Sequence, residues 1–311
     1  MYDNIEFVIC CGGESTRNFP HSKGIPHKSL MPFGDMRLID YILKDIIQMG
    51  GRHITIVSSS IQVIQMFQRA LETDNHTMEK LQKKGKGDIA QILQSTFLPD
   101  DTDLKFVLQE HPLGTAHVLA CAQQAIGPRH IMLIFPDDII ISKDPHNSHI
   151  KRLTEAFLQN PKRILLTGLW REDVSNNAIL VNNRIIEKPK NPTTHIAGMS
   201  PNVLPNDIIQ FITQQIPQKQ QWVKETGKEW LYMDSVNDFL DAGGEARGFF
   251  VEMFIKKDED LMLDTGTLPL YEQGQLYALL KLSHYAPQNR AWAQKLLADK
   301  DETIFKNETS K

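Results

Sequence analysis

The sequence predicts an α/β fold, in which a β-sheet is covered by helices. In the first sixty residues, apolar runs at 5–11 and 53–57 flank residues 38–49, whose apolar side chains recur at helical spacing. Strand and helix patterns continue to alternate as far as about residue 255, which is typical of a sheet built from β–α–β units with right-handed connections. A chain of 311 residues is also long enough to bury a large core.

The first apolar run is rich in β-branched residues and predicts a buried strand that enters a turn at Gly12 and Gly13. The helix over 38–49 is expected to end at the glycine pair 50–51. The patterns further predict helices at 61–71, 116–126, near 206–216 and near 232–241, and strands at 104–108, 130–135, 163–169, 178–181, 184–187 and near 247–255. We therefore expect one α/β domain over residues 1–269, with a polar helix-and-loop insertion at 72–90, and a helical tail over 270–311.

Composition restricts the class of protein. The chain has 34 Lys and Arg against 38 Asp and Glu, so its formal charge is −4, and it lacks the basic footprint of a general nucleic-acid-binding protein. No apolar run approaches the 18 residues of a membrane span, and the first residues lack the features of a signal peptide. The cysteines Cys10, Cys11 and Cys121 are odd in number and lie in apolar runs, which indicates reduced core residues. We expect a cytoplasmic protein without nucleic-acid or membrane partners.

The loop after the first strand concentrates positive charge. Its glycine turn has neither the Gly-x-Gly-x-x-Gly spacing of dinucleotide sites nor the Gly-Lys-Ser/Thr of a P-loop. Residues 15–33 contain no carboxylate, and prolines at 20, 26 and 32 are expected to hold the loop rigid outside helices and strands. Fixed cations beside backbone N–H groups suit a polyphosphate, with a solvated surface loop as the alternative. The cations are Arg17, Lys23 and Lys28, with His21 and His27 between them.

The same loop carries the pattern Gly13-x-Ser15-Thr16-Arg17-x-x-Pro20-x-Ser22-Lys23-x-Ile25-Pro26 … Lys28-x-Leu30-x-Pro32. It resembles the signature of the sugar-1-phosphate nucleotidyltransferases, and most closely the branch that uses UTP and glucose 1-phosphate. The resemblance implies a Rossmann-like mixed β-sheet flanked by helices, of the nucleotide-diphospho-sugar transferase type. It implies catalytic roles for Lys28 and Arg17, and nucleotide binding by Gly12, Gly13 and Thr16. Two residues depart from the signature, because Ser15 replaces a glycine and His27 is inserted before Lys28.

A second segment, residues 109–117, lies between a predicted strand and a predicted helix. Gln109 can donate and accept hydrogen bonds together, as the O4/N3 edge of a pyrimidine requires. An isolated glutamine is more often a surface residue, and only its register with the family motif points to a role in binding. The segment resembles the family's Gln-x-x-x-x-Gly-Leu-Gly-His-Ala, which implies that Gln109 and Gly114 bind the uracil.

Two carboxylates follow predicted strands. Asp137 comes directly after the strand at 130–135, where α/β sheets place ligand and metal chemistry, although Asp137 and Asp138 could equally cap a helix. Asp264 ends the apolar segment 261–263. The resemblance implies that Asp137 and Asp264 bind Mg²⁺, a cation that takes oxygen ligands and keeps several waters. His146 and His149 have no motif partner and predict a solvated loop.

Glu187 and Lys188 stand at the end of the predicted strand 184–187, directly before Pro189. Adjacent Glu and Lys side chains are usually exposed charges. The segment resembles the family's Glu-Lys-Pro, which implies that Glu187 binds the sugar hydroxyls and Lys188 the sugar phosphate.

These resemblances together predict transfer of the uridylyl group of UTP to glucose 1-phosphate, with release of pyrophosphate and assistance from Mg²⁺. No Ser-His-Asp or Cys-His nucleophile motif is evident, which suits direct in-line attack. Two alternatives remain open: the same chemistry with another nucleotide or sugar, and a weakly active paralogue that binds nucleotide sugars and regulates a partner. The family resemblance also predicts a homodimer or homotetramer.

Overall fold

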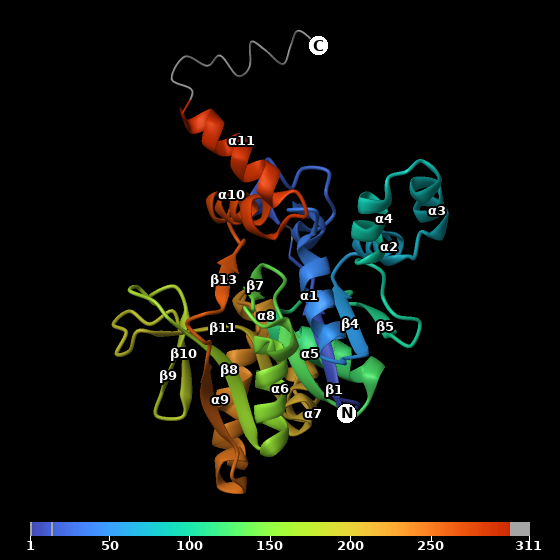
Figure 1. Cartoon of the computed structure of the whole chain (residues 1–311). Coiled ribbons are helices and arrows are strands. Elements are labelled where there is room, and N and C mark those ends of the chain that lie inside the picture. Colours follow the sequence, from blue (N-terminus) through green and yellow to red (C-terminus); the bar gives the residue numbers. More distant parts are fainter. Residues whose placement is uncertain (1, 14, 299–311) are drawn as a thin grey trace.

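The computed structural model describes residues 2–13 and 15–298 and has a nine-stranded mixed sheet at its centre (Figure 1). The strands lie in the order β10-β9-β11-β6-β1-β4-β5, and β8 pairs with β11 and β12. Their bounds are β1 Ile5–Cys10, β4 His53–Ser58, β5 Asp103–Leu108, β6 His130–Ile134, β8 Arg163–Trp170, β9 Ala178–Val181, β10 Arg184–Glu187, β11 Ile196–Leu204 and β12 Phe250–Ile255. The predicted α/β class is confirmed.

The sheet is parallel in its first half and mixed in its second. β1 pairs in parallel with β4 and β6, and β4 with β5, because each connection passes through a helix. β11 then runs antiparallel to β6 and β8, whereas β12 runs parallel to β8. Parallel strands that share a direction bring their carboxyl ends to one edge, and β1, β5 and β6 accordingly end together where the candidate site lies.

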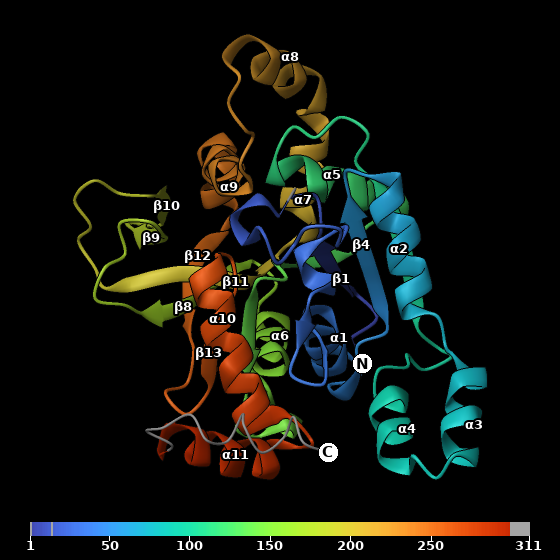
Figure 2. The ribbon, with the colours of Figure 1, turned by 90° about the horizontal axis from the view of Figure 1, so that it is seen from above.

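Helices cover both faces of the sheet (Figure 2). One face packs on α1 Leu38–Gln48, α2 Ile61–Leu71 and α6 His149–Gln159, and the other on α5 Thr115–Ile126, α7 Asn206–Gln214 and α9 Tyr232–Phe239. β1 serves both cores, since Phe7 faces the first and Val8 the second. Glu6 is fully buried in β1 and is neutralised by Arg129, whose Nη1 lies 3.0 Å from its Oε2.

A two-stranded ribbon stands beside the central sheet and carries acidic residues toward it. It consists of β7 Asp138–Ile141 and β13 Leu261–Asp264, which pair antiparallel with Asp138 opposite Asp264. Ile139 of β7 packs into a small core with Phe33, of the short hairpin β2 Pro32–Phe33 and β3 Met36–Arg37, and with Tyr271. This core fastens the ribbon to the loop that follows β1.

Two helical segments lie at the margin of the fold. The insertion predicted at 72–90 forms α3 Asn75–Lys83 and the start of α4 Gly87–Gln94, which continues beyond the predicted bound. Helix α3 buries no side chain. The tail forms α10 Leu268–Tyr277 and α11 Ala286–Ala298, and its predicted continuation over 299–311 lies outside the described residues. Tyr285 Oη donates to Asp88 Oδ2 at 2.6 Å and so joins the tail to α4. Over residues 2–13 and 15–298, no helix is long and apolar enough to cross a membrane.

In the central sheet the sequence patterns miss β11, although it lies inside the sheet. The short strands β2, β3 and β7 outside this sheet are missed as well. Gly198, Ser200 and Pro201 weaken the β-propensity of β11. The register of its pairing with β8 shifts between Met199 and Asn202, and this irregularity accommodates the proline. All its residues after Ile196 are buried, so tertiary packing outweighs local preference.

Other local expectations are also wrong. Helix α8 Ile216–Thr226 was not predicted, since its polar sequence has only weak apolar periodicity. Asp138 begins strand β7 and does not cap a helix. His149 lies on no solvated loop, because it opens α6, is fully buried and has its Nε2 2.9 Å from Thr167 Oγ1.

Candidate active site

A cleft in two parts opens at the carboxyl ends of β1, β5 and β6. Its larger part has a volume of about 630 Å³ and its smaller part about 220 Å³. Arg17 and Asp137 line both parts and mark their junction. The cleft is therefore shaped for two ligand groups that meet beside a cation and a carboxylate.

The larger part collects the residues predicted for the nucleotide. They come from the loop after β1, the loop between β5 and α5, and the residues after β6. The predicted residues that line it are Gly12, Gly13, Thr16, Arg17, Lys28, Gln109, Gly114 and Asp137. Predicted residues as far apart in the chain as Gly12 and Asp137 thus meet in one cavity, as the shared strand direction leads us to expect.

The smaller part contains the predicted Glu187 and Asp264. Burial raises the pKa of Glu187, and the nearby charge of Asp234 acts in the same direction. Lys188 lines neither part: its side chain is exposed, and its backbone adopts a left-handed φ of 47°.

Sequence reasoning missed several residues of the smaller part, because they lie on the segment before β9, on the unpredicted β11 and on α9. They are Asn176, Asn177, Met199 and Met233. Asn177 Nδ2 lies 3.2 Å from the sulfur of Met199, so these two side chains form one wall. Only the polarity of the pair at 176–177 could have signalled a site in the sequence.

The loop after β1 is held by hydrogen bonds as well as by its prolines. Ser15 adopts a left-handed φ of 57° where the family has glycine, and its Oγ accepts a hydrogen bond of 2.8 Å from the backbone N of Lys28. The expectation that the cations lie outside any helix is wrong, because Arg17 and Lys28 each sit in a short 3₁₀ turn, Thr16–Asn18 and Lys28–Leu30. The serine side chain thus ties the two turns together.

The inserted His27 is buried, with 1% of its surface exposed. Its Nδ1 accepts a hydrogen bond from the backbone N of Ser29 at 3.3 Å and lies 2.8 Å from Ser29 Oγ, so it caps the turn that carries Lys28. Burial lowers the pKa of His27 to about 4, and the charge of Lys28 acts in the same direction. The inserted residue is therefore buried in the wall of the larger cavity, which His27 and Lys28 both line.

Both predicted metal carboxylates have cationic neighbours. Lys28 Nζ forms an ion pair with Asp137 Oδ2. Arg171, which sequence reasoning missed, lies 3.9 Å from Asp264 Oδ2 through its Nη2. Asp138 is close to both Asp137 and Asp264. Burial and the charges of these two carboxylates raise the pKa of Asp138 well above the ordinary range. A hydrogen bond of 3.1 Å from the backbone N of Ser200 acts in the opposite direction.

The carboxylates of Asp137 and Asp264 converge above Gly266. A Cβ on this glycine would lie 3.0 Å from Asp137 Oδ2 and 3.1 Å from Asp264 Oδ1, so a side chain there would fill the space between them. Over residues 2–13 and 15–298, no three His, Cys, Asp or Glu side chains form a ready-made metal site. Two carboxylates fit Mg²⁺, which is commonly held by one or two carboxylates, substrate phosphates and water.

Gly114 is required by the backbone of a distant segment. It has a φ of 123°, and a Cβ would lie 2.5 Å from the carbonyl O of Trp230 and 2.7 Å from its N. The backbone N of Trp230 donates to Leu113 O at 2.7 Å, and that of Ala116 donates to Trp230 O at 3.0 Å. Close approach of two backbones therefore forms the wall of the larger cavity at this point.

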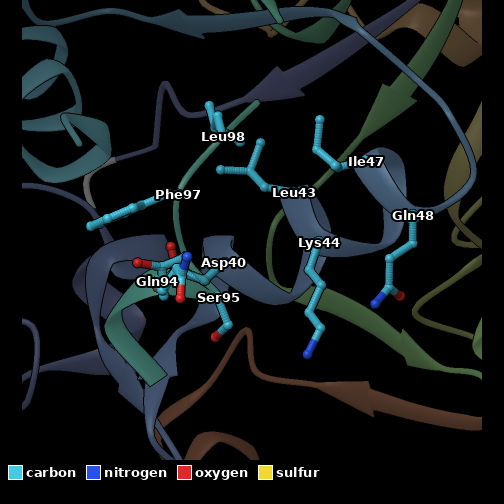
Figure 3. A pocket seen from close by; sticks show the side chains of 10 residues that line it. Asp40, Leu43, Lys44, Ile47, Gln48, Gln94, Ser95, Phe97 and Leu98 are labelled. Atoms are coloured by element: carbon cyan, nitrogen blue, oxygen red, sulfur yellow. The ribbon is translucent and has the colours of Figure 1, made fainter. Parts of the chain in front are cut away.

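A separate cavity of about 320 Å³ lies between α1 and residues 94–98 (Figure 3). Its lining mixes apolar side chains, among them Leu43, Phe97 and Leu98, with a larger number of polar and charged ones. Its buried carboxylate, Asp40, is bound by Arg37 at 2.6 Å. The carboxylate of this cavity is thus already paired, and its other charged lining side chain is Lys44.

The arrangement of the cleft can be compared with known proteins. The model of the nucleotidyl transferase family matches residues 6–269. The chain belongs to the nucleotidyl transferase family. The predicted family and enzyme class are thereby confirmed.

Curated relatives of this nucleotidyltransferase have modest sequence identity. UTP–glucose-1-phosphate uridylyltransferase 2 of Staphylococcus saprophyticus is 28% identical over 67% of this chain and 74% of its own. The UTP–glucose-1-phosphate uridylyltransferase of Escherichia coli K12 is 25% identical over 61% of this chain and 68% of its own.

Solved structures agree in fold. A UDP-glucose pyrophosphorylase of Acinetobacter baumannii superposes with a TM-score of 0.77 at 20% identity, over 94% of this chain and 99% of its own. A UTP-bound form from the same organism gives a TM-score of 0.76 at 18% identity, over 95% and 99%. The predicted nucleotidyltransferase type of fold is thereby confirmed.

Proposed function

We propose that this nucleotidyltransferase joins UTP and glucose 1-phosphate to give UDP-glucose and pyrophosphate. The observation that carries the proposal is the two-part cleft, with Arg17 and Asp137 at its junction. The names of the curated relatives, all UTP–glucose-1-phosphate uridylyltransferases among those compared, supply the identity of the substrates.

The larger part of the cleft would take UTP. Gln109 and Gly114 lie where the base would bind, and the glycine turn offers backbone N–H groups to the phosphates. Arg17 and Lys28 would hold the triphosphate, since fixed cations stabilise the charge that develops on transferred phosphoryl groups. Lys23, the third cation of the loop, has an exposed side chain and does not line this part of the cleft.

The smaller part would take glucose 1-phosphate. Glu187 can accept hydrogen bonds from sugar hydroxyls, and the side chains of Asn176 and Asn177 can both donate and accept them. Lys188 would reach the sugar phosphate from the rim by a change of side-chain rotamer. A phosphate oxygen of the sugar phosphate then attacks the α-phosphorus of UTP in line, and the bond to the leaving pyrophosphate breaks.

Asp137 and Asp264 would hold Mg²⁺ between the two substrates, because their carboxylate oxygens converge above Gly266. When bound, this cation lowers the repulsion between the two phosphate groups. A cytoplasmic location and a homodimer or homotetramer stay predictions.

The test is the release of pyrophosphate from a panel of nucleoside triphosphates and sugar 1-phosphates, with and without Mg²⁺. We expect the highest kcat/KM for UTP with glucose 1-phosphate, and only in the presence of Mg²⁺. A higher value for another pair would move the enzyme to another substrate within the class. No release with any pair would support the regulatory alternative, which the departures at Ser15 and His27 suggest.

A further inference from the structure

Gln109 lies at the centre of a chain of hydrogen bonds that leads away from the cleft. The side chain is 2% exposed and comes directly after β5. Its Nε2 lies 3.2 Å from the carbonyl O of Gly114 and 3.1 Å from Nδ1 of His117. His117 Nε2 in turn lies 3.5 Å from Cys121 Sγ, one turn further along α5.

The Gly114 carbonyl decides which way the amide points. A carbonyl oxygen can only accept, so the atom of Gln109 that faces it must be the amide nitrogen. The second N–H of that nitrogen then points at His117 Nδ1, which must accept. The proton of the neutral imidazole therefore sits on Nε2, where it can be donated to Cys121 Sγ.

The protonation states of the neighbours agree with this assignment. Burial lowers the pKa of His117, against a hydrogen bond with the backbone of His111 that raises it, and the charge of His111 lowers it further. The imidazole is therefore neutral near pH 7. Burial raises the pKa of Cys121 to about 11, which keeps its sulfur a thiol. The thiol sulfur is a weak acceptor and suits the long contact.

With both N–H groups engaged inward, Gln109 offers only its oxygen to the cleft. Oε1 lies 3.4 Å from the position a Cβ on Gly12 would take, at the glycine turn that lines the larger cavity. No side chain or backbone group of the described residues donates a hydrogen bond to it. A free acceptor that faces position 3 of the base suits the N3–H of uracil and thymine. It opposes cytosine there, whose N3 is a bare acceptor and whose donor is the exocyclic N4 amino group instead.

We propose that His117 is a positioning residue that fixes the amide of Gln109 with its oxygen toward the base, and so selects UTP over CTP. The inference rests on the proposed function in one respect, namely that the base lies in the larger cavity. Without the imidazole, one N–H of a nearly buried amide loses its partner, and such an unpaired donor is costly. The amide can then relieve the cost by turning its nitrogen toward the cleft.

The experiment measures the equilibrium binding of UTP and of CTP by calorimetry, which requires no turnover. Wild-type protein should prefer UTP. His117→Leu should lower the UTP-to-CTP preference about tenfold, as expected for one misplaced hydrogen bond with its unpaired donor. His117→Asn should restore most of it, because Asn Oδ1 can stand near the position of Nδ1. Cys121→Ala should leave the preference nearly unchanged, since the thiol is the weakest partner in the chain.

A purely structural role predicts a different result. If His117→Leu weakens UTP and CTP binding by equal factors, or if His117→Asn fails to restore the preference, the proposal is overturned. It is also overturned if the wild-type protein binds CTP as well as UTP. Where turnover can be measured, the loss for UTP should appear in KM with kcat nearly unchanged. Absence of turnover with preserved UTP selectivity would refute the proposed function and leave this inference in place.

Discussion

The inserted His27 should make the folded protein sensitive to mild acid. Its pKa falls from the ordinary 6.5 to about 4 because the ring is buried beside Lys28. In the unfolded chain the ring takes up its proton near pH 6.5, whereas in the folded protein it stays neutral until about pH 4. The unfolded state thus binds more protons between these values, and stability is lost as the pH falls through this window.

The size of the effect follows from the shift. One pKa unit corresponds to about 1.4 kcal/mol, so His27 costs about 2 kcal/mol at pH 5 and about 3.4 kcal/mol once both states are protonated. His149 has its pKa lowered to about 4 by burial in the same way and adds a similar loss. Because burial also lowers the pKa of His117 and His130, several groups contribute and the wild-type protein alone cannot isolate His27.

The perturbation is His27→Asn, which removes the titrating ring but leaves an oxygen near the position of Nδ1 to accept from the backbone N of Ser29. Urea unfolding at pH 7 and pH 5 gives the free energy of unfolding of each protein. The loss between the two pH values should be about 2 kcal/mol smaller in the variant than in the wild type. Equal losses would refute the reasoning, since they would mean that His27 keeps the same pKa in both states.

Three further predictions concern the cleft. Lys28→Ala should lower turnover in a pyrophosphate-release assay by a factor of about 10²–10³, as expected for the loss of one charge-stabilising donor. Circular dichroism should show that the fold is preserved. Near-wild-type turnover would exclude Lys28 as the catalytic lysine. Asp264→Asn keeps an acceptor for the Gly266 N–H, now 2.9 Å from Oδ1, but should abolish the Mg²⁺-dependent rate, and an unchanged Mg²⁺ titration would remove Asp264 from the metal site. Gly114→Ala should lower the free energy of unfolding by about 1–3 kcal/mol and raise KM for UTP, because its Cβ meets the Trp230 backbone. The control for Tm is Gly87→Ala, whose Cβ meets nothing within 4 Å.

Local patterns predicted the parts of the fold whose packing follows from their own sequence. β1, α1 and β4 have unbroken apolar periodicity, and each lies where the pattern placed it. β11 could not be predicted in this way, since Ser200 and Pro201 argue against a strand and its partners β6, β8 and β9 are brought beside it only by the fold. The same holds for Met199 and Asn177, which reach the cleft through that strand and its neighbour.

The residues of the site likewise differ in whether the sequence could locate them. Gln109 directly follows β5 and Asp137 comes shortly after β6, so their positions relative to the strand ends were enough to place them at one edge. Arg171 gave no signal, because its contact with Asp264 joins residues that are close only in the folded chain. The direction of the Gln109 amide was equally hidden, since it depends on a carbonyl and an imidazole contributed by the next helix turn.

The positive charge of residues 15–33 also changes meaning once the chain is folded. The sequence shows a loop without acids, yet Asp137, more than a hundred residues away, forms an ion pair with Lys28. In this ion pair the positive charge of Lys28 is balanced by Asp137. The lysine also offsets the repulsion between the Asp137 carboxylate and the nearby Asp138 and Asp264. A triphosphate must therefore compete with Asp137 for Lys28. When the triphosphate takes the lysine, the carboxylate of Asp137 becomes free, and this is one of the two carboxylates proposed to hold Mg²⁺. Nucleotide and cation should accordingly bind more tightly together than either binds alone, because each takes over a partner that the other displaces.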